Sequence, residues 1–333
     1  MNLIAKRILP VTVAAALAVS VPLAGCSSAP ADGGADASKT ESGQAQQAGA
    51  VTFTDDTGAE VTVENPQRVV ACMGSFASTW ELAGGTLVGA SDDAFTLSDY
   101  ELTSENVQKV GDFSSLNLES IIALAPDFVI MTSGSGGRGG DSNQADLKAA
   151  LAASNIPVAC FQVTTFADYE RMMRTCCDIT GRDDLYEQNA QAVSDRIAAI
   201  TAKVPAGEAP SALVLTTYSG GTRVQASSTM TGAMLADLGV KNLADENPSL
   251  LKDFSLESII EMNPDFIFVV PMGNDDAAAM KALEDQTAGN PAWATLNAVQ
   301  NGRYVTLDPH LFQYKPNERW DQSYQALFDA LYA

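Results

Sequence analysis

The chain has a single histidine, His310, and this limits the chemistry that its side chains could perform. Metal sites built from several imidazoles and the paired-histidine metalloprotease helix are excluded. A Ser–His dyad would have only His310 as its base, and no Gly-x-Ser-x-Gly turn is present. We therefore expect no enzymatic activity. His310 could line a ligand cleft, serve the fold, or ligate haem iron or corrinoid cobalt opposite Met73, Met230 or Met272.

Side chains suited to holding a small molecule follow several short apolar runs. Ligands of open parallel sheets lie beyond the carboxyl ends of the strands, and in two-domain proteins they lie between the domains. On that basis the candidate ligand-binding residues are Ser75, Phe76, Trp80, Arg138, Tyr218, Arg223, Met272, His310 and Tyr314.

Two arginines and two aromatic residues among these candidates have specific alternatives. The guanidinium groups of Arg138 and Arg223 suit carboxylates, catecholates or haem propionates, but each could equally be a solvated loop charge. The glycine-rich run around Arg138 lacks the Gly-Lys-Ser/Thr ending of a phosphate loop and is expected to be a mobile lip. Trp80 and Tyr218 could stack on a flat ring, although Trp80 could instead belong to the core.

Length and charge restrict the class of protein further. A chain of 333 residues predicts two domains. Asp and Glu number 41 against 19 Lys and Arg, which gives a formal charge of −22. Such a surface repels phosphate backbones, so nucleic acid is not an expected partner.

The first 25 residues form a predicted signal peptide. Lys6 and Arg7 provide a basic start, Ile8 to Leu23 is apolar but short for a membrane span, and Leu23-Ala24-Gly25-Cys26 resembles a bacterial lipobox. That resemblance implies cleavage before Cys26 and a lipid on its sulfur. The alternative is an ordinary secretory signal with a chance cysteine. Residues 26–50 lack Leu, Ile, Val and aromatic side chains and are predicted to be a flexible tether.

Four further cysteines fit no metal-binding spacing. Cys72 and Cys160 lie in predicted strands, and Cys176 and Cys177 are adjacent in a predicted helix. A disulfide is permitted outside the membrane, but we favour buried thiols over a Cys72–Cys160 bridge.

An internal repeat organises the folded part. The segments 118–128 (LESIIALAPDF) and 256–266 (LESIIEMNPDF) are identical at eight of eleven positions. Each predicts a helix, a turn at Pro-Asp and a buried strand, so the chain should contain two related lobes.

The elements around the repeat predict an α/β fold. Short apolar runs at 69–72, 158–161, 212–215 and 304–307 fit buried parallel strands with helices between them. Apolar residues step by three and four through 183–203, which predicts one long helix between the lobes. The expected domains are an amino-terminal lobe at 51–182, this linking helix, and a carboxyl-terminal lobe at 204–333.

The order of these segments resembles a known family. The stretches 68–85 (RVVACMGSFASTWELAGG), 111–131, 253–270, 290–308 (NPAWATLNAVQNGRYVTLD) and 311–332 are similar to substrate-binding lipoproteins of ABC importers for ferric siderophores, haem and cobalamin. The resemblance implies two lobes with mostly parallel sheets on a helical backbone, a ligand cleft between them, and no chemistry on the ligand. Where family members often have histidine, this chain has Gln313, so haem ligation from that position is not expected.

The resemblance also implies partners and a location. An acidic residue on each lobe would dock onto basic pockets of a permease dimer that carries its ATPase, and Glu119 and Glu257 occupy the matching repeat positions. Each could instead be a first-turn acid favoured by the helix dipole. The protein is expected to be a monomer, anchored outside the cytoplasm by lipid on Cys26. It would carry a ferric siderophore, with haem or cobalamin as the alternative cargo and no resident cofactor. A surface interaction lipoprotein remains a further alternative.

Overall fold

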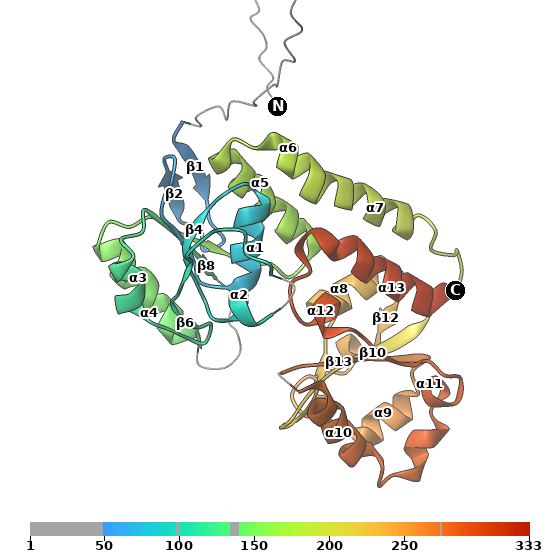
Figure 1. Cartoon of the computed structure of the whole chain (residues 1–333). Coiled ribbons are helices and arrows are strands. Elements are labelled where there is room, and N and C mark those ends of the chain that lie inside the picture. Colours follow the sequence, from blue (N-terminus) through green and yellow to red (C-terminus); the bar gives the residue numbers. More distant parts are fainter. Residues whose placement is uncertain (1–48, 98–99, 134–139, 274) are drawn as a thin grey trace, which may run out of the picture. The chain divides into compact units, whose positions relative to one another are not determined.

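The computed structural model describes residues 49–97, 100–133, 140–273 and 275–333 (Figure 1). Two sheets organise these residues, one in each half of the chain. These sheets confirm the predicted α/β class with two lobes around central, mostly parallel sheets.

Within the described part, no helix is both long enough and apolar enough to cross a membrane.

The amino-terminal lobe contains a five-stranded parallel sheet with the order β5-β4-β3-β8-β9. Its inner strands are buried apolar runs, as expected for a sheet covered on both faces. An antiparallel hairpin of β1 and β2 precedes this sheet in the sequence. A two-stranded antiparallel ribbon of β6 and β7 follows β5. The strands are β1 Val51–Thr54, β2 Glu60–Val63, β3 Val69–Ala71, β4 Leu87–Ala90, β5 Gln108–Lys109, β6 Gly111–Asp112, β7 Ser115–Leu116, β8 Phe128–Thr132 and β9 Val158–Phe161.

Five helices belong to this lobe: α1 Gly74–Leu82, α2 Asp93–Thr96, α3 Leu118–Ala123, α4 Gly140–Ala153 and α5 Phe166–Thr180. The best defined start is that of α5, where the Thr165 side chain and Asp168 cap each other reciprocally. The helix ends at Gly181, which takes the left-handed conformation with φ 71°.

The linking helix runs in line across the top of Figure 1 but is not uniformly α-helical. It comprises α6 Asp183–Tyr186, a π-helical segment Glu187–Gln191, and α7 Ala192–Thr201. Within the π segment, the Asn189 amide donates to the Leu82 carbonyl at 2.9 Å, and the Tyr169 hydroxyl donates to the Asn189 carbonyl at 3.0 Å. The first half of the linking helix packs on α5 and the second on α13.

The carboxyl-terminal lobe is built on the strand order β11-β10-β13-β14, with β12 also paired to β10. Only β11 runs antiparallel, through a hairpin with β10. The strands are β10 Ser211–Tyr218, β11 Gly221–Gln225, β12 Lys241–Asn242, β13 Phe266–Pro271 and β14 Tyr304–Thr306. The α-helices are α8 Met230–Asp237, α9 Leu256–Met262, α10 Asp276–Thr287, α11 Asn297–Gln300, α12 Pro309–Phe312 and α13 Trp320–Tyr332, and 3₁₀ turns lie at Leu243–Glu246, Pro291–Thr295 and Asn317–Arg319.

The two copies of the repeat adopt the same local structure. Ala125 and Asn263, at equivalent positions after α3 and α9, both have φ 44°. The following aspartates then bond to the backbone that leads into the neighbouring strand: Asp127 accepts from the amide of Arg68 at 2.8 Å, and Asp265 from that of Ser211 at 2.9 Å. The repeat is thus a helix, a left-handed turn and a carboxylate that fixes the adjacent strand.

The four cysteines in the described residues are free thiols. Cys72 directly follows β3, whose Ala71 pairs with Ile130 of β8, and Met131 of β8 pairs with Cys160 of β9. Cys72 and Cys160 are therefore two strands apart. At roughly 4.8 Å per strand, this separation exceeds the reach of a disulfide. Burial raises the pKa of the Cys72, Cys160, Cys176 and Cys177 thiols, as expected for inert core residues.

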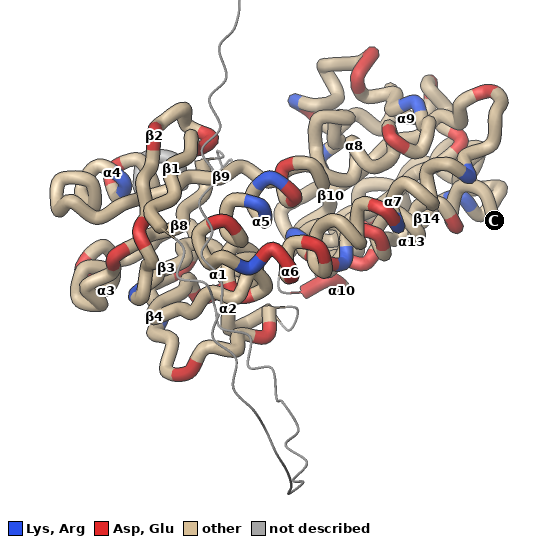
Figure 2. Tube along the Cα trace, turned by 90° about the horizontal axis from the view of Figure 1, so that it is seen from above, with Lys and Arg blue, Asp and Glu red and all other residues tan. Residues whose placement is uncertain are grey.

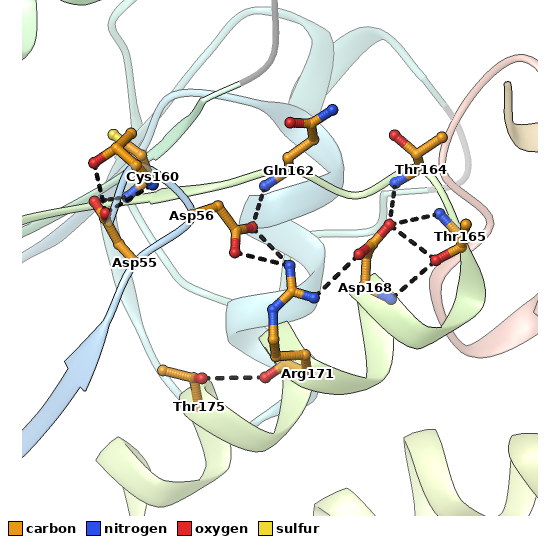
Figure 3. A network of polar contacts seen from close by, with 10 residues as sticks. Asp55, Asp56, Cys160, Gln162, Thr164, Thr165, Asp168, Arg171 and Thr175 are labelled. Carbon is orange, nitrogen blue, oxygen red and sulfur yellow. Dashed lines mark hydrogen bonds and ion pairs between the residues drawn. The ribbon is translucent and has the colours of Figure 1, made fainter. Parts of the chain in front are cut away.

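Asp55, in the turn of the first hairpin, ties that hairpin to the sheet (Figure 3). Its Oδ1 accepts hydrogen bonds from the Thr57 hydroxyl at 2.6 Å and the Ala59 amide at 3.0 Å. Its Oδ2 accepts from the Cys160 amide at 3.1 Å and from Lys148 Nζ at 3.2 Å. Burial alone would raise the pKa of Asp55, but these donors outweigh it and hold the pKa below its usual value of 3.8.

The substitution Asp55→Asn should lower the free energy of unfolding by about 2 kcal/mol at pH 7, because a buried carboxylate with several donors is lost. Because the pKa is lowered on folding, the contribution of Asp55 is fully present well above pH 3.8 and is lost as the pH falls through the folded pKa. Urea unfolding at pH 7 and near pH 3 measures both effects.

Asp112→Asn is the matched control, since Asp112 is an exposed carboxylate whose hydrogen bonds, among the described residues, come from the backbone amide and the hydroxyl of Ser114. We expect this control to cost less than about 1 kcal/mol. Equal destabilisation by the two variants would contradict a specific role for Asp55.

Candidate functional site

A cavity of about 460 Å³ lies beyond the carboxyl ends of β3, β8 and β9. This is the edge at which ligands of parallel sheets are expected. Met73, Ser75 and Phe76 line it from the start of α1, Thr132 from the end of β8, and residues 162–164 from the loop after β9. Residues 313–315, far along the chain, complete the lining. We call this space the first cavity.

Close packing shapes the α1 side of the first cavity. The Gly74 amide donates to Asp93 Oδ2 at 2.8 Å, while Asp93 Oδ1 accepts from the Ser91 hydroxyl. A Cβ atom at Gly74 would lie 2.8 Å from the Ala94 amide nitrogen, so this approach requires glycine. The buried Ser75 hydroxyl, next in the chain, has no hydrogen-bond partner among the described residues. It is thus an unused polar group in the cavity lining.

A network of ion pairs and hydrogen bonds holds the loop after β9 in place (Figure 3). The Arg171 guanidinium bridges Asp56 at 2.8 Å and Asp168 at 3.1 Å. Asp56 in turn accepts a hydrogen bond from the backbone N–H of Gln162 at 2.6 Å, and Asp168 accepts one from the backbone N–H of Thr164 at 3.1 Å. Burial would raise the pKa of Asp168, but the backbone bonds and Arg171 lower it overall. The hairpin turn and α5 therefore fix the backbone of residues that line the cavity.

Long-range contacts bring residues 313–315 to the same place. The buried Asn317 donates its side-chain amide to the Ser75 carbonyl at 3.0 Å. The Tyr100 hydroxyl donates to the Lys315 carbonyl, and the Tyr314 hydroxyl donates to the Gly273 carbonyl, both at 3.3 Å. The segment between α12 and α13 is thus held against the amino-terminal strand ends.

A smaller cavity of about 200 Å³ shares Gln313 and Lys315 with the first and extends over the carboxyl-terminal sheet. Thr216 of β10 and Arg223 of β11 are cross-strand partners in its lining. Burial lowers the pKa of the Lys315 ammonium, although Asp168 opposes the shift. We call this space the second cavity.

Five of the predicted ligand-binding residues line these two cavities. Ser75, Phe76 and Tyr314 line the first cavity, and Arg223 and Met272 line the second. The structure thus brings together residues from the start of α1, from β11, from the end of β13 and from the loop after α12. Their role in binding stays a prediction.

Of the other four predicted residues, three line neither cavity and one lies outside the described residues. Trp80 is a correction: it is 1% exposed, packs against Phe128, and donates its indole N–H to the Thr86 carbonyl, so it belongs to the core. Tyr218 lies at the end of β10 with the Arg223 guanidinium 5.3 Å from its ring centre. His310 lies in α12 with its ring 6.0 Å from that of Tyr314, and it lines neither cavity. Arg138 lies outside the described residues.

The two predicted docking glutamates occupy equivalent exposed positions. Glu119 is in the first turn of α3 and Glu257 in the first turn of α9. The side chains of Asn117 and Ser255 cap these helices by accepting from the amides of Ser120 and Ser258. Because the caps already satisfy those donors, neither glutamate is needed to cap its helix.

Sequence reasoning missed several lining residues: Tyr100, Phe113, Gln162, Val163, Thr164, Gln313 and Lys315. The loop after β9 could have been found, because it follows a predicted strand just as the chosen loops do. Lys315 directly follows a candidate, but its approach to Ser75 depends on contacts between residues more than 200 positions apart.

The lining of the first cavity is suited to holding a small molecule. Among the described residues, no group of three His, Cys, Asp or Glu side chains is placed to hold a metal ion. The first cavity combines the aromatic rings of Phe76, Tyr100, Phe113 and Tyr314 with polar and charged side chains, which include Asp93, Asp112 and Lys315. A mixture of aromatic walls and convergent polar groups is found in small-molecule sites.

Comparison with known proteins identifies relatives along most of the chain. Residues 69–311 match the family model described as periplasmic binding protein. The iron(3+)-hydroxamate-binding protein FhuD of Bacillus subtilis (strain 168) is 23% identical over 291 residues, which cover 83% of this chain and 85% of that protein. The Fe(3+) dicitrate-binding periplasmic protein FecB of Escherichia coli (strain K12) is 23% identical over 270 residues, or 78% and 82% of the two chains.

A solved structure shows the same fold. The structure of Staphylococcus aureus IsdE complexed with heme superimposes with a TM-score of 0.63 at 18% identity, covering 80% of this chain and 99% of that one. The family consists of extracytoplasmic solute-binding proteins, not enzymes, that work with ABC importers. Because the family model spans well over half of the sequence, the chain belongs to the periplasmic binding protein family.

Proposed function

We propose that this protein captures a ferric siderophore in the first cavity and delivers it to the permease of an ABC importer. The observation that carries the proposal is the cavity itself. Its volume of about 460 Å³ lies in the range of small-molecule sites, and its aromatic walls and convergent polar groups come from distant parts of the chain.

The described side chains favour capture without turnover. The raised pKa values of the buried cysteine thiols keep them protonated and unreactive at neutral pH. His310 lines neither cavity, and its ring lies 6.0 Å from that of Tyr314. These features fit a site that binds a ligand and releases it unchanged.

Two relatives support an iron complex as the cargo. One is named for binding ferric hydroxamate and the other for binding ferric dicitrate. Haem or cobalamin is the second candidate, supported by the heme complex of the similar IsdE structure. In this chain a thioether, that of Met73, faces the first cavity, and it could contact the metal of a flat macrocycle.

Glu119 and Glu257 are proposed to dock on the permease. Each is exposed and stands in the first turn of its helix at the same position of the repeat. Two of the three large apolar side chains that are exposed among the described residues lie near them in sequence: Ile122, 43% exposed, one turn after Glu119, and Leu251, 39% exposed, six residues before Glu257. A charge next to an apolar side chain suits a specific protein contact.

The amino terminus is proposed to anchor the protein to the outer face of the cell membrane. The lipobox-like Leu23 to Cys26 supports lipid attachment at Cys26, and residues 26–50 would separate the folded part from the bilayer. The protein is proposed to act as a monomer.

The ligand proposal predicts that Tyr314→Ala weakens binding of a ferric siderophore about tenfold, because an aromatic wall of the first cavity is lost. Phe95→Ala is the control, since Phe95 is 39% exposed and lines neither cavity. Titrations of the purified protein with ferric siderophores, haemin and cobalamins, followed by tryptophan fluorescence and visible spectra, measure the affinities. The proposal would be abandoned if no compound of these three classes bound.

The docking proposal predicts that Glu119→Lys combined with Glu257→Lys abolishes iron uptake in cells while ligand affinity stays within about twofold. Charge reversal places lysines opposite the basic pockets of the permease, where the glutamates would have docked. Each substitution lies at an exposed helix start and should lower the free energy of unfolding by only about 1 kcal/mol. Glu105→Lys with Glu208→Lys changes the net charge equally at exposed positions outside the two repeat helices. Normal uptake by the first double variant would refute the docking assignment.

The anchoring proposal predicts that Cys26→Ala leaves the protein unlipidated and moves it from the membrane fraction to the soluble extracytoplasmic fraction. Metabolic labelling with a fatty acid, followed by fractionation and blotting, measures both properties. The alternative of an ordinary signal peptide predicts no label on either protein and the same distribution for both.

A further inference from the structure

The second cavity differs in charge from the rest of the protein. The chain has 41 acidic residues against 19 lysines and arginines, and Figure 2 shows acidic residues along both lobes. Yet among the described residues the only charged side chains that line the second cavity are Arg223 and Lys315.

Several other basic residues in the second half of the chain pair with carboxylates. Arg196 pairs with Asp321, Lys281 with Asp285 and Lys241 with Glu246. Among the described residues, by contrast, neither Arg223 nor Lys315 has an acidic group within ion-pair distance. Two cations thus line one small space whose described lining includes no carboxylate.

The β10–β11 hairpin directs polar side chains into this space. Arg223 and Gln225 alternate with the buried Val224, so they share one face of the sheet. Thr216 is the cross-strand partner of Arg223 and lies on the same face. Gln313, in the loop after α12, adds an amide to the lining of the second cavity. The two cations are thus surrounded by neutral donors suited to an oxyanion.

We propose that the second cavity is an oxyanion subsite that receives a free carboxylate of the captured ligand, held by Arg223 and Lys315. This inference rests on the proposed function and narrows it to ligands that keep an uncoordinated carboxylate when iron is bound. A ferric complex of a carboxylate chelator and the propionates of haem share this chemistry, whereas an uncharged ferric trihydroxamate lacks it.

The dimensions and connections of the second cavity fit an arm of a ligand. Its volume of about 200 Å³ is below the range of sites that enclose a whole drug-sized molecule. Lys315 and Gln313 also line the first cavity, so a ligand seated there can extend a carboxylate past them. Burial lowers the pKa of the Lys315 ammonium and the charge of Asp168 offsets this only in part, so a carboxylate arriving beside Lys315 would supply a partner at ion-pair distance.

The test compares Lys315→Met and Arg223→Gln with matched controls. Lys252→Met removes an exposed lysine of the carboxyl-terminal lobe that lines neither cavity. Arg303→Gln removes an exposed arginine that lies over an aromatic ring, Phe266, as Arg223 lies over Tyr218. The probes are ferric citrate, an uncharged ferric trihydroxamate, haemin and haemin dimethyl ester, measured by calorimetric titration.

We expect each cavity variant to weaken binding of the carboxylate-bearing probe by about tenfold or more, because a charge-assisted hydrogen bond is lost. The controls should change affinity less than about twofold. The uncharged trihydroxamate and the diester should bind weakly and respond to neither cavity variant. Tighter binding of ferric citrate than of the trihydroxamate would identify a carboxylate chelator as the ligand. Tighter binding of haemin than of its dimethyl ester would identify haem.

Thermal unfolding separates this role from a structural one. Removing a partly buried ammonium that has no ion-pair partner among the described residues should leave the Tm of Lys315→Met equal to or above that of the parent while ligand binding falls. If Lys315→Met unfolds at a lower temperature than the parent, its loss of binding could be structural. The affinity of Arg223→Gln, a substitution at an exposed position, then decides alone whether the second cavity binds the carboxylate.

Two results overturn the inference while the proposed function stands: tight binding of the uncharged trihydroxamate with no preference for carboxylate, or equal effects of the cavity and control variants. Failure of every ferric chelate and haemin probe to bind would instead refute the proposed function itself.

Discussion

The hydrogen bond from the Asn317 side chain to the Ser75 carbonyl is the contact on which the site depends. It is buried and joins residues 242 positions apart, linking the turn before α13 to the start of α1. Asn317 adopts φ 50°, a left-handed conformation that asparagine tolerates better than most residues. One side chain thus both permits the turn and attaches it to the amino-terminal strand ends. Both cavities need that turn, because Gln313 and Lys315 line both of them.

The elements of the fold could be predicted from the sequence because their signals are local. The 158–161 run is β9 without change, and both repeat copies form the predicted helix and strand. Apolar runs bounded by turn residues determine these elements whatever lies elsewhere. The linking helix was predicted as one α-helix, and its π-helical segment was not foreseen. Side-chain periodicity cannot show such a segment, because the bonds of Asn189 with Leu82 and Tyr169 come from other helices.

The site was predicted less completely, because it depends on contacts between distant segments. Trp80 follows a strand in the same way as Phe76, yet its indole turns into the core to reach the Thr86 carbonyl. Lys315 lies one residue past Tyr314, the last candidate chosen from the sequence. It lines both cavities and carries a charge. Residue type and strand position find the correct edge of the sheet. They do not decide which side chains on that edge face inward.

The π-helical segment restricts how the length of the linking helix can change. Each residue of an α-helix turns the chain by about 100°, so inserting or deleting one residue in 187–191 would rotate all of α7 relative to α5. The buried face of α7, which carries Val193, Ile197 and Ile200, would then turn away from its present packing partners, and α7 would meet α13 with a different face. Natural variants of this protein should therefore tolerate substitutions along the helix far better than changes in its residue count, and length differences should occur instead in the turn at 205–209.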